Sequence, residues 1–319
     1  MRTLCYAPSR ITNKSGEPVM QIHETVNSER YLTLRARLDN GLRKRLTHSS
    51  PSLEKLYNAM AYGVFEPGKC LRPILAYSAC EAMGGPLDAA DGVACAVELM
   101  HAYSLIHDDL PALDDALVRR GKPALHVAYG ESTALIAGDA LQALAFESLA
   151  QPSTVSVGIR LQMVAVMARA VGPAGLAGGQ FLDITLAGAR PTPEQIAEMQ
   201  RLKTGALIEA SVVMGAMASG ANVETSHFVA LRKYAEQIGR AFQVRDDILD
   251  VVADPVALGK AVHADQPADK STAVSSLGLE GARHYAWQLL QGALTALEAF
   301  GPEADALRQL AHVVVERDL

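Results

Sequence analysis

Cysteine is scarce in this chain, and its thiols follow no pattern. Cys5, Cys70, Cys80 and Cys95 form no C-x-x-C pair and have no histidine-rich surroundings. Such spacing argues against a zinc site and against a disulfide framework. A reducing compartment is consistent with this cysteine usage, so we predict a cytoplasmic protein.

An excess of positive charge and long apolar runs are also missing. The formal net charge is −6, and no basic run provides a footprint for a phosphate backbone. We therefore expect no nucleic-acid partner, although small anions can still bind locally. Residues 1–20 lack the apolar core of a signal peptide, and no apolar run approaches the ~18 residues that a membrane span needs. The protein is predicted not to be membrane-embedded.

Strand patterns are scarce as well, whereas helical spacing is common. From about Tyr31 onward, apolar residues recur every three or four positions, as in Val93, Ala96, Val97 and Met100. Glycine or proline interrupts the pattern, for example in "MGGPLD" and "GARPTP". The sequence predicts a loose, polar N-terminal extension over residues 1–25 and a single all-α domain over residues 26–319, with about ten or more helices.

The stretch "HAYSLIHDDLPALDD" changes from apolar to acidic within a few residues. Its aspartates are Asp108, Asp109, Asp114 and Asp115. Carboxylates this close repel one another, so the cluster is tolerable only if it is hydrated, protonated or bound to a cation. Because Pro111 should end the helix near Asp109, we expect Asp114 to return towards Asp108 through a loop.

A second acidic stretch, "GRAFQVRDDILDVV", places Asp246 and Asp250 four residues apart, with Asp247 beside them. This spacing puts Asp246 and Asp250 on one face of a helix. Magnesium binds one or two carboxylates, keeps several waters and takes its other ligands from substrate phosphates. Two aspartate faces therefore suggest a diphosphate bridged by magnesium, although either cluster alone is better explained as a hydrated helix end or a solvated helix face.

Basic residues that suit phosphate oxygens occur between and around these stretches. They are Lys69, Arg72, Arg119, Arg120, Lys203, Lys260 and Lys270. Arginine forks and lysine ammonium groups are the usual protein partners of phosphate. Each residue alone is weak evidence, because an isolated lysine is most often a solvated surface group.

The order of the motifs resembles a known family. "DDLPALD", "RRG", "GGQFLD", "KTGALI", "FQVRDDILD" and "LGK" follow one another as in the trans-prenyltransferase (polyprenyl synthase) family, and Pro111 and Ala112 within the first motif resemble its bacterial farnesyl diphosphate synthases. The resemblance covers nearly the whole chain after the N-terminal extension. It implies an all-α fold of the isoprenoid synthase type, with helices around a central cavity, and a homodimer.

The resemblance also implies roles for individual residues. The ligands of up to three magnesium ions would be Asp108, Asp109, Asp114, Asp246 and Asp250. The allylic diphosphate would be held by Arg119, Lys203, Thr204, Gln243 and Lys260, of which the first four also serve in catalysis. The diphosphate of isopentenyl diphosphate would be held by Lys69, Arg72, His101 and Arg120. A histidine in an apolar helix is otherwise commonly a core residue, so His101 depends most on the resemblance.

The implied activity is a condensation of isopentenyl diphosphate with dimethylallyl or geranyl diphosphate to give farnesyl diphosphate. Metal ions and cationic side chains stabilise the departing diphosphate, isopentenyl diphosphate attacks the allylic cation, and a proton is then lost. Tyr103 and Ser104 are the implied chain-length residues, since Tyr103 lies roughly 7 to 8 Å before Asp108 along a helix. The simpler interpretation of Tyr103 is a core aromatic residue.

Three positions depart from the family pattern, and other functions stay open. Cys70 lies where arginine is usual, while His263 and Asp269 replace common glycines in a segment that should close over the diphosphate. These departures leave open a non-catalytic partner subunit of the same fold. A geranyl or geranylgeranyl diphosphate synthase is a further alternative. A class I terpene cyclase is a weaker rival, because its second metal motif needs other residues than Asp246, Asp250 and Asp254.

Overall fold

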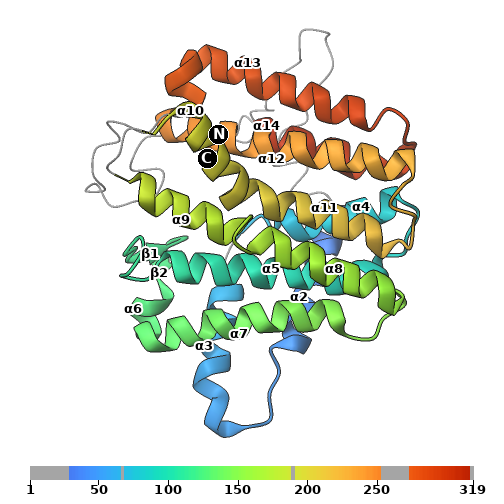
Figure 1. The fold of residues 1–319 in the computed structure, drawn as a ribbon. Coiled ribbons are helices and arrows are strands. Elements are labelled where there is room, and N and C mark those ends of the chain that lie inside the picture. The colour runs from blue at the N-terminus through green and yellow to red at the C-terminus, as the bar shows by residue number, and fades with distance from the viewer. Residues whose placement is uncertain (1–28, 66–67, 188–190, 253–272, 317–319) are drawn as a thin grey trace, which may run out of the picture.

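The predicted all-α fold class is confirmed by the computed structural model, which describes residues 29–65, 68–187, 191–252 and 273–316, apart from the side chain of Asp250 (Figure 1). The predicted extension over residues 1–25 lies outside the described residues. The elements are α2 (Glu29–Arg45), η1 (Pro51–Leu53), α3 (Glu54–Val64), α4 (Leu71–Ala82), α5 (Leu87–Asp108), β1 (Val118–Arg119), β2 (Lys122–Pro123), α6 (Leu125–Tyr129), α7 (Glu131–Ala150), α8 (Val157–Val171), α9 (Leu176–Leu186), α10 (Pro193–Gln200), η2 (Arg201–Gly205), α11 (Ala206–Ala218), α12 (Ser226–Val252), α13 (Ala273–Ala296), η3 (Pro302–Ala304) and α14 (Asp305–Glu316).

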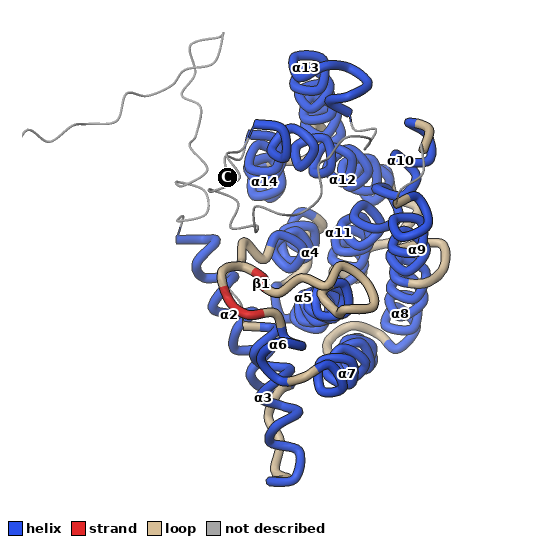
Figure 2. Tube along the Cα trace, turned by 90° about the vertical axis from the view of Figure 1, so that its left-hand side faces the viewer, coloured by secondary structure: helices blue, strands red, loops and turns tan. Residues whose placement is uncertain are grey.

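Helix α5 lies in the middle of the bundle. Viewed along the helices, it is surrounded by its neighbours (Figure 2), and it packs against α2, α3, α4, α7 and α11. Its sequence "LDAADGVACAVELM" is rich in alanine and valine, whose small side chains allow other helices to approach. A helix buried on most sides ends at Asp108 and so carries the first aspartate motif to one end of the core.

Helices α12, α13 and α14 pack together beside α11. A buried hydrogen bond joins two of them, since the Tyr234 hydroxyl of α12 donates to the Leu307 carbonyl of α14 over 2.7 Å. Helix α13 is kinked at Gly278, where φ is +72°. Helix α12 carries the second aspartate motif, and α14 is the last helix of the described chain.

A short β-hairpin follows the first aspartate motif. Strands β1 and β2 are antiparallel, with Arg119 opposite Lys122. The two residues between them, Arg120 and Gly121, have φ values of +50° and +77°. Positive φ at both central residues is the geometry of a type I′ turn, in which glycine is the natural second residue. The "RRGK" sequence therefore folds into a tight hairpin that holds two arginines next to α5.

One stretch of the described chain, Val157–Leu186, is apolar and long enough to pass a length and composition test for a membrane span. Only 22% of its apolar window is buried within the fold. The structure breaks this stretch into α8 and α9 near Gly172 and Gly175. A single stretch of this kind is weak evidence for a span, and α8 with 15 residues and α9 with 11 are each shorter than the ~20 residues that a spanning helix needs.

Candidate active site

The first aspartate motif forms a closed loop at the end of α5. The helix ends at Asp108, two residues before Leu110, whose carbonyl accepts hydrogen bonds from the backbone of Leu113 and Asp115. The amide of Asp114 then donates to the carbonyl of Asp108 over 2.9 Å. The predicted return of Asp114 to Asp108 is confirmed, because the proline ends the helix and these turn bonds fold the chain back.

Asp109 has a different environment from its neighbour. Its side chain is 3% exposed, and both of its carboxylate oxygens accept hydrogen bonds from the Arg119 guanidinium, with Nε to oxygen distances of 3.0 and 3.1 Å. This fork holds the pKa of Arg119 above its ordinary value, chiefly through the hydrogen bonds with Asp109. In the described structure Asp109 therefore anchors the hairpin, and its role as a metal ligand stays a prediction.

Asp108 contacts a lysine from a distant segment. Lys203 Nζ lies 3.5 Å from Asp108 Oδ2 and 2.8 Å from Asp183 Oδ2. Burial raises the pKa of Asp108 to about 6, although the positive charge of Lys203 opposes this rise and the negative charge of Asp114 adds to it. Burial opposes the charged form of Lys203, but the two carboxylates outweigh it and its pKa is raised. Ionisation of Asp108 is therefore costly in its buried position near Asp114, and a bound cation would offset this cost.

The second aspartate motif lies on α12 as the spacing predicts. Asp247, rather than Asp246, is buried, and its carboxylate accepts hydrogen bonds from Gln200 Nε2 (3.1 Å), Gln243 Nε2 (3.1 Å) and the backbone amide of Ala273 (2.9 Å). Asp247 therefore ties α12 to α10 and α13. Because the amide nitrogen of Gln243 is used in this way, its carbonyl oxygen is the atom that can face a cation.

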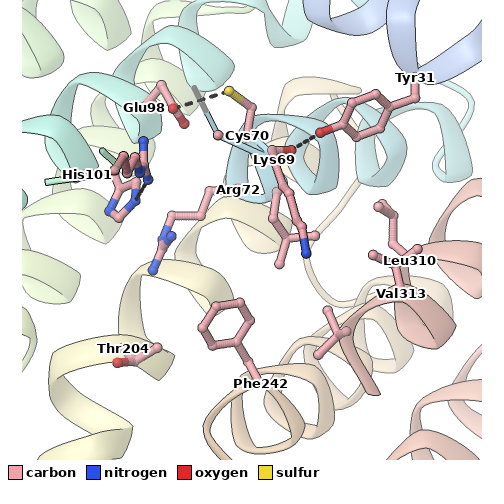
Figure 3. Close-up of a pocket in the computed structure, with 14 residues that line it drawn as sticks. Tyr31, Lys69, Cys70, Arg72, Glu98, His101, Thr204, Phe242, Leu310 and Val313 are labelled. Carbon is pink, nitrogen blue, oxygen red and sulfur yellow. Dashed lines mark hydrogen bonds between the residues drawn. The ribbon is translucent and has the colours of Figure 1, made fainter. Parts of the chain in front are cut away.

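The four residues predicted to bind isopentenyl diphosphate meet in one cavity. Lys69, Arg72, His101 and Arg120 all line a cavity of about 450 Å³, together with Thr204. Figure 3 shows Lys69 and Arg72 projecting into the space above Thr204 and Phe242. The remaining lining residues are Tyr31, Gly68, Cys70, Leu71, Glu98, Phe242, Leu310, Val313 and Val314. Three cations over an apolar floor form an environment suited to an anionic head group with an apolar tail.

His101 lies against the hairpin arginine. Arg120 Nη2 is 3.4 Å from His101 Nε2. Burial lowers the pKa of His101 well below its ordinary value, and the charges of Arg72 and Arg120 lower it further. The imidazole is therefore neutral at physiological pH and can accept a hydrogen bond from an arginine.

Four residues of this site have no role predicted from the sequence motifs. The Arg35 Nη1 group donates to the Gly68 carbonyl over 2.6 Å, and the Tyr31 hydroxyl donates to the Lys69 carbonyl, so α2 holds the loop before α4. Glu98 is 6% exposed and accepts a hydrogen bond from Cys70 Sγ at 3.3 Å (Figure 3). Asp183 is the fourth, although it lies in the "GGQFLD" motif.

Cys70 has an unusual backbone for a residue other than glycine, with φ at +41°. Burial is the main cause that raises the pKa of its thiol, and the charge and hydrogen bond of Glu98 add to it. The thiol is therefore a neutral donor in a cavity of charged groups. The departure noted at this position removes a potential cation from the cavity wall and leaves Lys69 and Arg72 in place.

The two residues predicted to set chain length, Tyr103 and Ser104, lie on α5 and are not among the residues that line this cavity. Tyr103 is half-buried, and its ring meets His107 edge-on with centroids 4.7 Å apart. Burial raises the pKa of Tyr103, Asp139 of α7 adds to this, and a hydrogen bond with Gln142 of α7 opposes it. Ser104 donates to the His101 carbonyl over 2.8 Å. Tyr103 therefore lies between α5 and α7, and its role in chain length stays a prediction.

Several predicted residues lie outside the described part of the chain. They are Asp254, Lys260, His263, Asp269 and Lys270. Among the described residues, no group of three or more histidine, cysteine, aspartate or glutamate side chains could by itself hold a metal ion.

The chain belongs to the polyprenyl synthetase family, whose model matches residues 53–300. The family membership predicted from the motifs is confirmed, and with it the interpretation of the chain as an enzyme of the transferase class. The rival interpretation as a terpene cyclase has no support from this match.

Individual relatives narrow the comparison. The chain is 46% identical over 264 residues to the farnesyl diphosphate synthase of Escherichia coli (strain K12), which covers 81% of this chain and 88% of that protein. It is 37% identical over 283 residues to the geranylgeranyl diphosphate synthase of Cyanophora paradoxa, covering 88% of this chain and 93% of that protein. The crystal structure of geranyltransferase from Legionella pneumophila is similar with a TM-score of 0.78 and 34% identity, covering 89% of this chain and 94% of that chain.

Proposed function

We propose that this enzyme condenses isopentenyl diphosphate with dimethylallyl or geranyl diphosphate and releases farnesyl diphosphate. One observation carries the proposal: Lys203 and Thr204, neighbours in η2, face two different parts of the site. Lys203 contacts Asp108, whereas Thr204 lines the cavity with Lys69, Arg72 and Arg120. Element η2 would thus contribute one residue to each of two neighbouring diphosphate sites, as a reaction between two diphosphates requires. The relatives named above support the choice of substrates.

Asp108 and Asp114 fit magnesium, as their backbones are joined and their charges repel. We infer that these residues, with Asp246 and Asp250 from α12, hold up to three ions, and Asp109 stays a further candidate. When bound, magnesium supplies positive charge to the departing diphosphate. Arg119, Lys203 and Lys260 would add to that charge.

The cavity residues would bind and orient the second substrate. Arg72 and Arg120 present planar forks, and Lys69 a point charge, to the diphosphate of isopentenyl diphosphate. Neutral His101 would keep Arg120 in place through the contact at 3.4 Å. Binding the two reactants in fixed orientation turns a bimolecular encounter into a nearly unimolecular step.

The allylic cation needs dipoles and a dry surface. Thr204 and the carbonyl oxygen of Gln243 would stabilise the cation, because a hydroxyl or carbonyl dipole attracts a carbocation and is a poor nucleophile towards it. Phe242, Leu310 and Val313 form an apolar wall of the cavity, which limits access of water to the cation. The departed diphosphate is the proposed base that removes the final proton.

We further propose a homodimer in the cytoplasm. Large apolar side chains are exposed on α7, α8 and α9, an arrangement that favours self-association. They are Leu135, Ile136, Val157, Leu161, Phe181 and Ile184. The three described cysteines are free thiols, which supports a reducing compartment.

Incubation with magnesium, isopentenyl diphosphate and each allylic diphosphate, followed by mass analysis of the dephosphorylated products, tests the proposal. A main product of fifteen carbons supports it. Shorter or longer main products would favour the geranyl or geranylgeranyl alternative. A folded protein that yields no product under any of these conditions would favour the non-catalytic subunit.

A further inference from the structure

The segment that carries Lys203 and Thr204 is a π-helical turn. Element η2 joins α10 to α11, and the amide of Ala206 donates to the carbonyl of Arg201, five residues earlier. Such turns are rare, contain one residue more than a regular helix allows, and occur frequently at functional sites. The backbone of this turn carries Lys203 and Thr204, so the position of the turn sets where these two predicted catalytic side chains lie.

Helix α9 touches the backbone of this turn at Gly179. A Cβ atom at Gly179 would lie 2.2 Å from the nitrogen of Lys203, 2.6 Å from its Cα and 2.8 Å from the carbonyl carbon of Leu202. All three are backbone atoms, which cannot rotate away as a flexible side chain can. Gly179 is buried, so any side chain there must displace either α9 or the π-helical turn.

Helix α9 also holds the side chain of the same lysine. Asp183 lies four residues after Gly179 and therefore on the same face of α9. Its Oδ2 atom accepts a hydrogen bond of 2.8 Å from Lys203 Nζ. The same ammonium group also contacts Asp108. The helix thus restrains Lys203 at both ends, through a backbone contact and through a charged hydrogen bond.

We propose that Gly179 is a positioning residue, which sets the place of Lys203 and Thr204 by allowing α9 to pack directly on the π-helical turn. This inference rests on the proposed function for its catalytic consequence. The contact acts mainly on the site around Lys203, and it reaches the other substrate cavity only through Thr204, which lines it. Lys69 and Arg72 come from the loop before α4 and from α4 itself, and Arg120 from the hairpin, so their positions do not depend on α9.

The opposite side of the turn provides a matched control. Gly239 of α12 faces Gly205, and a Cβ atom at Gly239 would lie 3.4 Å from the Cα and 3.6 Å from the carbonyl oxygen of Gly205. These are ordinary van der Waals distances, so an alanine fits at Gly239 without displacing the turn. The same substitution on two sides of one turn therefore has two different expected outcomes.

The experiment compares Gly179→Ala and Gly239→Ala in the full chain with magnesium and both substrates. A misplacement of about 1 Å at a catalytic group costs roughly 100-fold in rate, so kcat of Gly179→Ala should fall by about that factor. Its KM for isopentenyl diphosphate should stay within about threefold of wild type, since charge contacts of the other diphosphate site are intact. Gly239→Ala should keep kcat and both KM values near wild type.

Two results would overturn the proposal. The first is a folded Gly179→Ala protein with kcat near wild type, and the second is an equal loss in both variants. If Gly179→Ala fails to fold, hydrogen exchange of the wild-type protein tests the contact instead. The amides of residues 201–206 should exchange as slowly as those of α11. Exchange as fast as in an exposed loop would contradict the proposal that α9 restrains the turn. If the wild-type protein forms no product, the proposed function is refuted. The packing of Gly179 on the turn is then still tested by the exchange measurement.

Discussion

Asp108 lies where a buried helix ends beside Lys203, and its protonation is balanced between burial and neighbouring charges. Asp115, seven residues later, is exposed in the loop that follows and has φ at +47°, a conformation that asparagine also tolerates. These two aspartates therefore differ in environment although they belong to one motif. Comparing variants at Asp108 and Asp115 therefore distinguishes a specific role of Asp108 in the site from a general effect of losing one negative charge.

We expect Asp108→Asn to lower kcat by ~100-fold or more with the fold intact, because one carboxylate fewer misplaces the departing diphosphate. Asp115→Asn serves as the control and should keep near-normal turnover. Steady-state kinetics with magnesium, together with circular dichroism, measures both. Near-normal turnover of folded Asp108→Asn would remove this residue from the proposed metal site.

Tyr103 offers a test of product length. Since its ring is half-buried between α5 and α7, Tyr103→Ala should cost roughly 1–3 kcal/mol of stability and lengthen the main product to twenty carbons or more. Tyr62→Ala is the control, because Tyr62 is a half-buried aromatic residue that packs on Tyr129. Chromatography of the dephosphorylated products decides: a fifteen-carbon product from both variants makes Tyr103 an ordinary core residue.

At the scale of elements, an ion pair ties the β-hairpin to the end of α5. Asp109 binds the Arg119 guanidinium in strand β1, and Arg120 in the following turn reaches His101 in the cavity. A Cβ atom at Gly68 would lie 2.9 Å from Arg120 Nη1, so this arginine also packs closely on the loop before α4. Asp109 therefore acts on the cavity through the hairpin.

Asp109→Asn should weaken the fork and release the hairpin. We expect a loss of roughly 1–3 kcal/mol in the free energy of unfolding, which is less than for a fully buried pair because the Arg119 side chain is 30% exposed. The KM for isopentenyl diphosphate should rise about tenfold as Arg120 moves. A raised magnesium requirement with an unchanged KM for this substrate would instead identify Asp109 as a metal ligand.

At the scale of the whole molecule, the core holds ionisable groups that stay neutral to a higher pH in the folded chain than in the unfolded chain. Burial raises the pKa of Cys95 from 9.0 to about 11 and that of Cys80 from 9.0 to about 12. Burial also raises the pKa of Tyr77 and Tyr234. Each of these groups binds its proton more tightly in the folded chain, so stability is lost as the pH rises towards the folded pKa.

The free energy of unfolding should therefore fall by roughly 2–3 kcal/mol between about pH 8 and about pH 10 from the two thiols alone. Urea titrations at a series of pH values measure this fall. Cys95→Ala should remove roughly 1–1.5 kcal/mol of the fall in this range, the share of one thiol, because Cys80, Cys70 and the buried tyrosines still contribute. An unchanged slope in this variant would contradict the thiol assignment.

Helical segments and motif order were predictable from the sequence because both are local. Apolar spacing selects helices, and Pro111 ends α5 near the first aspartates whatever packs around it. The four residues predicted to bind isopentenyl diphosphate do meet in one cavity. The family was likewise recognisable from motifs that lie in a set order.

Only the tertiary structure decided which groups share a contact. Asp109 binds Arg119, Glu98 accepts from Cys70, and Gly179 packs on the backbone of Lys203, each across a distance in sequence that no local pattern spans. Such contacts depend on how closely two helices approach, which is set by packing of all their neighbours. The sequence by itself determined the chemical groups and their helices, while the packing of α9, α5 and the hairpin determined which carboxylates bind the arginine and the lysine.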